Sequence, residues 1–248
     1  HGDDLCNRQF STDNPDSILF LQGIPELLCG IIPKARSAAS GGHTAIYRVN
    51  SYTDTRIIGT TRDDAIGESF DKIGRMIGIP YPAGRGFDEL SREGFIEATC
   101  DEVSFYSKYK KSESYRSGDF NLPSPALNDG SLDFSFSGLK TAALNYINSA
   151  EQRGEEINRA DLAASYTHTI VKAVVKQTET ALRETGMKTL VLAGGVAANS
   201  HLRAAVKALA EKRIEEADST AVAVVLEGLL NKKTYCVIDL SSGHKADK

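Results

Sequence analysis

Residues 190–202 read LVLAGGVAANSHL, and the rest of the chain is best understood from this stretch outward. The segment Thr189–Ala193 is short, apolar and partly β-branched, which is typical of a buried parallel strand. Gly194 and Gly195 follow it directly. Glycine adopts positive φ readily and lets a ligand approach without meeting a Cβ atom. The pattern therefore predicts a strand followed by a tight turn that a ligand can approach.

The residues after this turn predict the start of a helix. Asn199 and Ser200 are of the types that cap helices, and we expect a helix over residues 201–209. A strand, a glycine turn and a helix start together can hold an anion or a nucleotide. The alternative is an ordinary connection between a strand and a helix, because paired glycines are common at turns.

Composition sets the broad class of the protein. The chain has 248 residues, of which 41% are hydrophobic and 25% charged, so it can bury a core as one large domain or two smaller ones. Its net charge of −4 is not that of a protein coated with basic residues for binding nucleic acid.

The four cysteines form no CxxC pair and fit neither a disulfide framework nor a zinc site. The most apolar stretch, residues 17–32, is interrupted by Pro25 and Glu26 and is too short to span a bilayer. Acidic residues near the N-terminus do not resemble a signal peptide. We expect a cytoplasmic protein in a reducing compartment, with no membrane partner.

Periodicity and turn residues predict the other elements. We expect strands at 44–49, 55–59, 133–137 and 234–240, helices at 61–79, from 140, at 161–184 and at 220–230, a flexible loop at 83–86 and a surface excursion at 91–130. Residues 40–90 and 131–209 should form the ordered core, whereas residues 1–37 and 241–248 should pack poorly.

The helix expected at 61–79 has two distinct faces. An apolar stripe, with Thr61 as the expected N-cap, contains Ile66, Phe70, Ile73 and Ile77. A second face carries Asp64, Glu68, Asp71 and Arg75. This face is either a solvated row of ion pairs, such as Glu68–Lys72 and Asp71–Arg75, or it places Asp71 in a cleft that binds ligand hydroxyls.

A glycine loop precedes the first expected strand of the core. Ser40, Gly41 and Gly42 lead into the strand at 44–49. Their backbone N–H groups and the Ser40 hydroxyl can hold phosphate or carboxylate oxygens. The alternative is a tight loop that binds no ligand.

Five stretches together resemble one family in that family's own order: SGGHT at 40–44, RDDAIGESFDKIGRMIGIPYPAG at 62–84, LDFSFSGLKTA at 132–142, DLAASY at 161–166 and LVLAGGVAANSHLR at 190–203. They resemble the tRNA N6-adenosine threonylcarbamoyltransferases (TsaD, also called YgjD or Gcp), and more closely the bacterial branch. The resemblance covers about residues 40–205.

The resemblance implies an α/β fold of the actin/Hsp70/sugar-kinase (ASKHA) type, with two domains around a nucleotide cleft. It implies transfer of a threonylcarbamoyl group from threonylcarbamoyl-adenylate to N6 of the adenosine beside the anticodon, in tRNAs that read codons beginning with A. The partners it implies are tRNA and the accessory proteins TsaB and TsaE. Its cofactor is one divalent metal ion, iron or zinc.

Substrate-binding positions follow from the resemblance, residue by residue. They fall on Ala38, Ala39, Ser40, Gly41, Gly42, Asp71, Gly84, Asp88 and Asn199. No catalytic residue and no metal ligand can be assigned in this way.

The two ends depart from the family pattern. We divide the chain into a divergent segment 1–37, a family-like core 38–205 and a divergent segment 206–248, so that the fold is incomplete at both ends. The family's H-x-x-x-H metal pair is missing, because residues 1–37 contain only His1. His43, His168 and His201 are expected to be surface or core residues.

Two other functions are therefore kept open. One is a metal-free copy that binds only a nucleotide or a partner protein, and the other is a kinase-like member of the same superfamily. Because the metal ligands are missing, we expect this chain as written to transfer threonylcarbamoyl groups poorly or not at all, with nucleotide binding retained.

Overall fold

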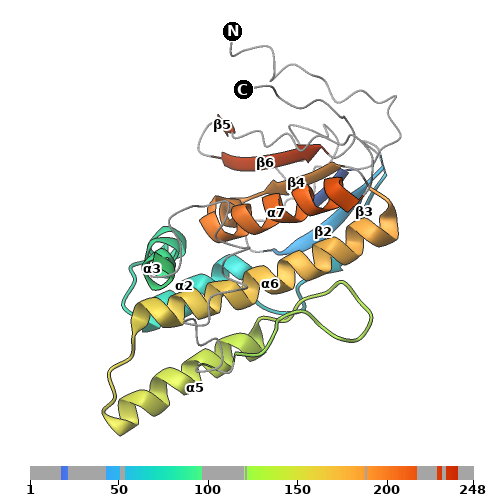
Figure 1. The fold of residues 1–248 in the computed structure, drawn as a ribbon. Helices are drawn as coiled ribbons and strands as arrows, with labels where there is room; N and C mark the ends of the chain where they lie inside the picture. Colours follow the sequence, from blue (N-terminus) through green and yellow to red (C-terminus); the bar gives the residue numbers. More distant parts are fainter. Residues whose placement is uncertain are drawn as a thin grey trace.

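The computed structural model describes residues 18–21, 43–50, 54–96, 120, 122–187, 189–216, 228–230 and 233–239. Within these ranges a six-stranded sheet packs against helices (Figure 1). Helix α7 packs against the strands, α6 runs beside it, and α5 lies furthest from the sheet (Figure 1). The architecture is α/β, as expected.

The strands follow the order β3-β2-β1-β4-β6-β5 across the sheet. Their bounds are Ile18–Leu21 (β1), Ala45–Val49 (β2), Thr55–Thr60 (β3), Thr189–Ala193 (β4), Gly228–Leu230 (β5) and Lys233–Asp239 (β6). Strands β1 and β4 pair in parallel, and the other neighbours pair antiparallel. The expected strands at 44–49, 55–59, 189–193 and 234–240 are confirmed, apart from small differences at their ends.

Strand β1 contradicts part of the prediction that residues 1–37 pack poorly. Leu21 pairs with Ile46 of β2 on one side and with Leu192 of β4 on the other. The apolar run Ile18–Leu21 thus fills the gap between the two strands and satisfies backbone groups of both. The rest of the segment 1–37 lies outside the described residues.

The prediction of a helix at 220–230 is wrong for its last residues, because Gly228–Leu230 forms β5 and pairs with β6. Residues 220–227 lie outside the described ranges. The strand expected at 133–137 is also wrong: Phe134 makes only isolated bridges, to Thr61 and to Ala126. The prediction rested on phenylalanines alternating with serines, and the two phenylalanines, Phe134 and Phe136, are indeed fully buried.

The helices are α2 (Ile66–Met76), α3 (Gly84–Ile96), α5 (Ser137–Arg153), α6 (Arg159–Thr185) and α7 (Ser200–Glu216), with a 3-10 turn η1 (Gly195–Ala198). The long helix expected at 161–184 is confirmed and ends at Gly186, which has φ 67°. The loop expected at 83–86 is wrong, because α3 begins at Gly84 and continues into the start of the expected surface excursion.

Helix α2 begins later than its sequence suggests. Thr61 lies in the turn after β3, where its N–H donates to the Thr44 carbonyl at 2.8 Å and its hydroxyl donates to the Asp64 carbonyl at 2.7 Å. These bonds hold residues 61–65 in a turn, so the prediction of Thr61 as N-cap is wrong. The helix start is instead bonded by Thr44, whose Oγ1 accepts from Ile66 N–H at 3.0 Å.

The core is formed where α2, α3 and α6 meet. The predicted apolar stripe of α2 is buried, with Ile73 fully inaccessible. Phe70 lies 4.9 Å from Phe87 between ring centroids, and Tyr166 lies 5.8 Å from Phe87. The Tyr166 hydroxyl is hydrogen-bonded to Ser69, which satisfies both groups in the interior. None of the described helices is long and apolar enough to cross a membrane.

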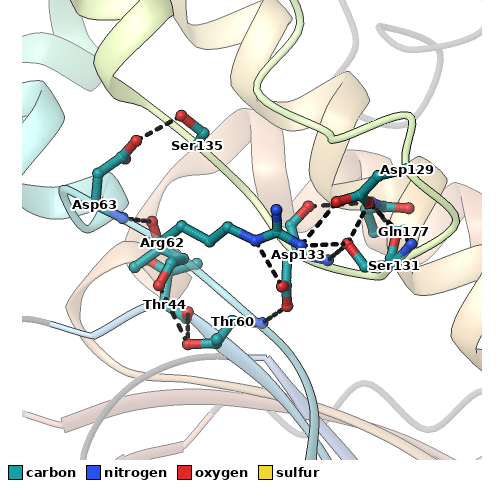
Figure 2. A network of polar contacts seen from close by, with 10 residues as sticks. Thr44, Thr60, Arg62, Asp63, Asp129, Ser131, Asp133, Ser135 and Gln177 are labelled. Carbon is teal, nitrogen blue, oxygen red and sulfur yellow. Dashed lines mark hydrogen bonds and ion pairs between the residues drawn. The ribbon is translucent and has the colours of Figure 1, made fainter.

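The turn at 61–65 also fastens the start of α5, as Figure 2 shows. Asp63 Oδ1 accepts from the N–H groups of Phe136 at 2.7 Å and Ser137 at 3.3 Å, and its other oxygen accepts from the Ser135 hydroxyl. Burial alone would raise the pKa of Asp63, but these hydrogen bonds outweigh it and lower the pKa. Asp63 thus caps a helix that begins more than seventy residues further along the chain.

Neighbouring ion pairs extend this contact. Arg62 donates to Asp133 at 2.9 Å and pairs with Asp129 at 2.8 Å (Figure 2). Asp133 also accepts from Thr60 N–H at 2.8 Å, which ties the end of β3 to the same segment. Asp64 pairs with Lys140 of α5 at 2.7 Å.

We predict that Asp63→Ala destabilises the fold by about 1 kcal/mol, because the start of α5 loses its cap. Asp63→Asn, which keeps an acceptor oxygen, should lose less. Urea unfolding gives the size of the effect, and hydrogen exchange at the first turn of α5 gives its place. Glu155→Ala, which removes an exposed carboxylate, is the control, and an equal effect there would contradict the capping role.

One buried and one half-buried histidine lie where α6 and α7 pack together. His201 is 6% exposed. Burial, followed by the positive charge of Arg92, lowers its pKa to about 3. Burial, followed by the charge of Lys172, lowers the pKa of His168 to about 4. His43 is exposed, so the expectation of surface or core histidines is confirmed.

Acid should therefore destabilise the fold. An unfolded histidine titrates near pH 6.5, so between that pH and the lower folded values the unfolded chain binds more protons. We expect the free energy of unfolding to fall as pH drops from 6.5 to 4, by up to about 1.4 kcal/mol per pH unit for each histidine. Urea unfolding at a series of pH values measures the slope. His201→Gln should flatten it and His43→Gln should not.

Candidate functional site

One edge of the sheet gathers the segments that carry the sequence motifs. Ala45, at the start of β2, pairs with Thr60, at the end of β3. Because Leu21 pairs with both Ile46 and Leu192, the ends of β1 and β4 lie at this same edge. His43 and Thr44, the turn after β3 and the glycine turn after β4 therefore meet there.

The glycine turn has the positive φ that its paired glycines allow, at its first residue. Gly194 has φ 101°, a conformation that residues with a side chain rarely adopt. Its carbonyl accepts from Ala197 N–H at 3.1 Å, which closes the turn of η1. A Cβ atom at Gly67 would lie 3.7 Å from Val196, so the first turn of α2 packs against η1.

Asp71 connects α2 to the start of α3. Its Oδ1 accepts from Ala83 N–H at 2.7 Å. The sequence leaves open whether this acidic face of α2 is a solvated row of ion pairs. That alternative is correct for Glu68, which pairs with Lys72 at 2.7 Å. Asp71 differs, since its carboxylate fixes the backbone directly before Gly84. The side chain thus has a structural partner whether or not it also binds a ligand.

Asp88 connects α3 to the start of α7. Its Oδ1 accepts from Ser200 N–H at 3.0 Å and from the Ser200 hydroxyl at 2.9 Å. Burial raises the pKa of Asp88, and the two bonds from Ser200 oppose that rise. Asn199 caps the same helix, as predicted, because its Oδ1 accepts from Leu202 N–H at 2.9 Å.

Gly84 has no evident packing reason to be glycine. A Cβ atom added there would meet no described atom within 4 Å, and the residue does not have a positive φ. Gly195 is equally open. Open space at both glycines is what close approach of a ligand would require.

The structure thus joins four of the predicted site residues through successive helix starts. Asp71 bonds the residue before Gly84, Asp88 lies one turn along α3, and its partner Ser200 follows Asn199. The remaining predicted positions, Ala38, Ala39, Ser40, Gly41 and Gly42, lie outside the described residues. His43 and Thr44, which follow them in the chain, lie at the edge where the glycine turn begins.

Two residues of this region were not singled out from the sequence as contacts. The sequence indicates Ser200 only as a helix-capping residue and Thr44 only as a residue of the strand expected at 44–49. The acidic face of the helix expected at 61–79 suggested a role for Asp71, but the donors to Asp71 and Asp88 come from residues 12 and 112 positions away. Only the tertiary fold identifies them.

The metal ion implied by the resemblance does not fit the side chains described. Within the described ranges no three His, Cys, Asp or Glu residues are grouped as metal ligands. His168 and His201 are near enough to interact electrostatically, but His43 lies exposed at the start of β2.

Comparison with known proteins agrees with the motifs. A family model described as tRNA N6-adenosine threonylcarbamoyltransferase matches residues 30–219. Proteins of that name are 40% identical over 181 residues in Moorella thermoacetica and 42% identical over 164 residues in Streptococcus suis. A third, from Clostridium botulinum, is 41% identical over 179 residues.

These alignments cover 73%, 66% and 72% of this chain, but only 47%, 42% and 44% of the relatives. The chain therefore spans less than half the length of these three relatives. Because the family model covers well over half of the chain and reads through all five motifs, the chain belongs to the tRNA N6-adenosine threonylcarbamoyltransferase family.

Proposed function

We propose that this chain serves the transfer of a threonylcarbamoyl group from threonylcarbamoyl-adenylate to N6 of the adenosine beside the anticodon, in tRNAs that read codons beginning with A. The observation that carries the proposal is the linkage of Asp71, Gly84, Asp88 and Asn199 across three helix starts in a chain of this family. In this proposal the described residues form part of the adenylate-binding site.

The chemistry of these groups suits an adenylate. Its phosphate and carbonyl oxygens need N–H donors, and its ribose and threonine hydroxyls need acceptors. The phosphate and carbonyl oxygens can come close to the backbone at Gly84 and Gly195, since no described atom fills the space where a Cβ would lie. Hydrogen bonds from described residues reach only Oδ1 of Asp71 and of Asp88, so we assign Oδ2 of each to ligand hydroxyls.

The proposal extends to features that the described residues support less directly. We propose the two-domain ASKHA fold, with residues 38–205 as the family core between the segments 1–37 and 206–248. The proposed partners are tRNA, TsaB and TsaE. A divalent iron or zinc ion is the cofactor that the family resemblance implies, and we assign no ligands for it in this chain. The metal-free nucleotide-binding or partner-binding protein is the alternative.

One reconstitution experiment tests both functions. The chain is incubated with TsaB, TsaE, threonylcarbamoyl-adenylate and a tRNA transcript, and modified adenosine is measured by mass spectrometry. Binding of the adenylate is measured separately by calorimetry. Transfer above the level of a reaction without the chain supports the proposal. Binding without transfer supports the alternative, and no binding contradicts both the proposal and the nucleotide-binding form of the alternative.

Gly84→Ala separates a binding role from a folding role. Alanine at this helical position should leave stability unchanged or raise it by up to about 1 kcal/mol. If the adenylate passes close to Gly84, the added methyl group should weaken its binding about tenfold or more. The matched control is Gly138→Ala, at an equally open position in the first turn of α5. Equal affinities for the two variants would contradict the assignment of Gly84.

Asp71 requires a pair of variants, because it bonds both backbone and, in our proposal, ligand. Asp71→Ala should cost about 1 kcal/mol of stability, since Ala83 N–H loses its acceptor. Asp71→Asn keeps an acceptor oxygen but loses the charge. It should fold like the unmodified chain and bind the adenylate more weakly. Thermal unfolding and calorimetry on the same samples check this, and unchanged affinity in both variants would make Asp71 purely structural.

A further inference from the structure

We propose that Ser200 is a positioning residue of the adenylate site, which acts through the carboxylate of Asp88. The inference rests on the function proposed above. It adds a residue to which the family resemblance assigned no ligand contact.

Ser200 makes two hydrogen bonds to one oxygen atom of Asp88. Its N–H and its hydroxyl both donate to Oδ1 of Asp88, at 3.0 Å and 2.9 Å. Two donors converging from one residue fix both the position of the oxygen and the rotation of the carboxylate plane. Within the described residues no hydrogen bond reaches Oδ2 of Asp88, so this orientation leaves the second oxygen for a ligand.

The same contact sets the spacing between two predicted ligand-binding segments. Asp88 lies one turn after Gly84 on α3, and Ser200 directly follows Asn199 at the start of α7. The Asp88–Ser200 contact therefore links the helix that begins at Gly84 to the helix that Asn199 caps. The affinity for a ligand that contacts both segments depends on how precisely their groups are placed relative to one another.

The hydroxyl of Ser200 also favours the charged form of Asp88. Burial raises the pKa of this carboxyl, and the hydroxyl is the largest influence that lowers it. The Ser200 N–H and the charge of Arg92 also lower it, whereas the charge of Glu89 raises it. An ionised carboxylate accepts from ligand hydroxyls more strongly than the neutral acid, so loss of the Ser200 hydroxyl should weaken binding most at acidic pH. Simple helix capping predicts no such pH dependence.

The experiment compares Ser200→Ala, which loses the hydroxyl but keeps the backbone bond, with Ser200→Thr, which keeps both. Ser137→Ala is the matched control: Ser137 also opens a helix, and its N–H also donates to an aspartate of another element, Asp63. Binding of threonylcarbamoyl-adenylate is measured by calorimetry from pH 5 to 8, and the pKa of Asp88 by carboxyl NMR without ligand.

We expect Ser200→Ala to raise the pKa of Asp88, to shift the acid limb of binding to higher pH, and to weaken binding about tenfold at pH 6. Ser200→Thr should stay within about twofold of the unmodified chain, and Ser137→Ala should bind unchanged. An unchanged Asp88 pKa in Ser200→Ala, or a shifted pKa with unchanged affinity, would overturn the positioning role. Failure of the unmodified chain to bind overturns the proposed function itself, and the positioning role with it.

Discussion

Backbone N–H groups at helix starts are the constraint on which this structure depends. The first turn of a helix leaves N–H groups without partners inside the helix, and buried ones must find acceptors elsewhere. Here the acceptors come from other elements: Thr44 bonds the start of α2, Asp63 that of α5, Asp71 the residue before α3, and Asp88 that of α7. Each bond joins two elements, so the helices are placed relative to one another by their first residues.

This arrangement explains why binding and folding are hard to separate at the candidate site. Asp71 and Asp88 each use one oxygen to hold backbone, and Asn199 holds the first turn of α7. A ligand bound by the same side chains would contact parts that already fix the positions of three helices. Such a site is preorganised, because its groups need little reorientation when the ligand arrives.

Local patterns in the sequence predicted what local physics determines. The β4 strand, the glycine turn, the buried stripe of α2 and the C-terminal Gly186 of α6 each depend on neighbours within a few residues. The errors lie where a distant partner decides. Thr61 looks like a cap until Thr44 is seen to bond Ile66, and residues 83–86 look like a loop until Asp71 is seen to bond Ala83. Ile18–Leu21 carries no motif, and only its place between β2 and β4 shows its importance.

The charge of Asp88 bears on whether this region binds a ligand at all. Burial raises the pKa of Asp88, so ionisation is disfavoured in the folded state, and stability present below the unfolded pKa is lost as pH rises through the folded value. Folding alone would be served as well by asparagine, whose oxygen could accept the same two bonds from Ser200 without a buried charge. The charge of Arg92 favours an ionised Asp88, and an ionised carboxylate accepts hydrogen bonds more strongly than an amide oxygen does. Its second oxygen accepts no hydrogen bond from the described residues, so we infer a partner that donates one to it. A hydroxyl-bearing adenylate is such a partner, and for that reason we place Asp88 and its contact with Ser200 at the centre of the proposed site.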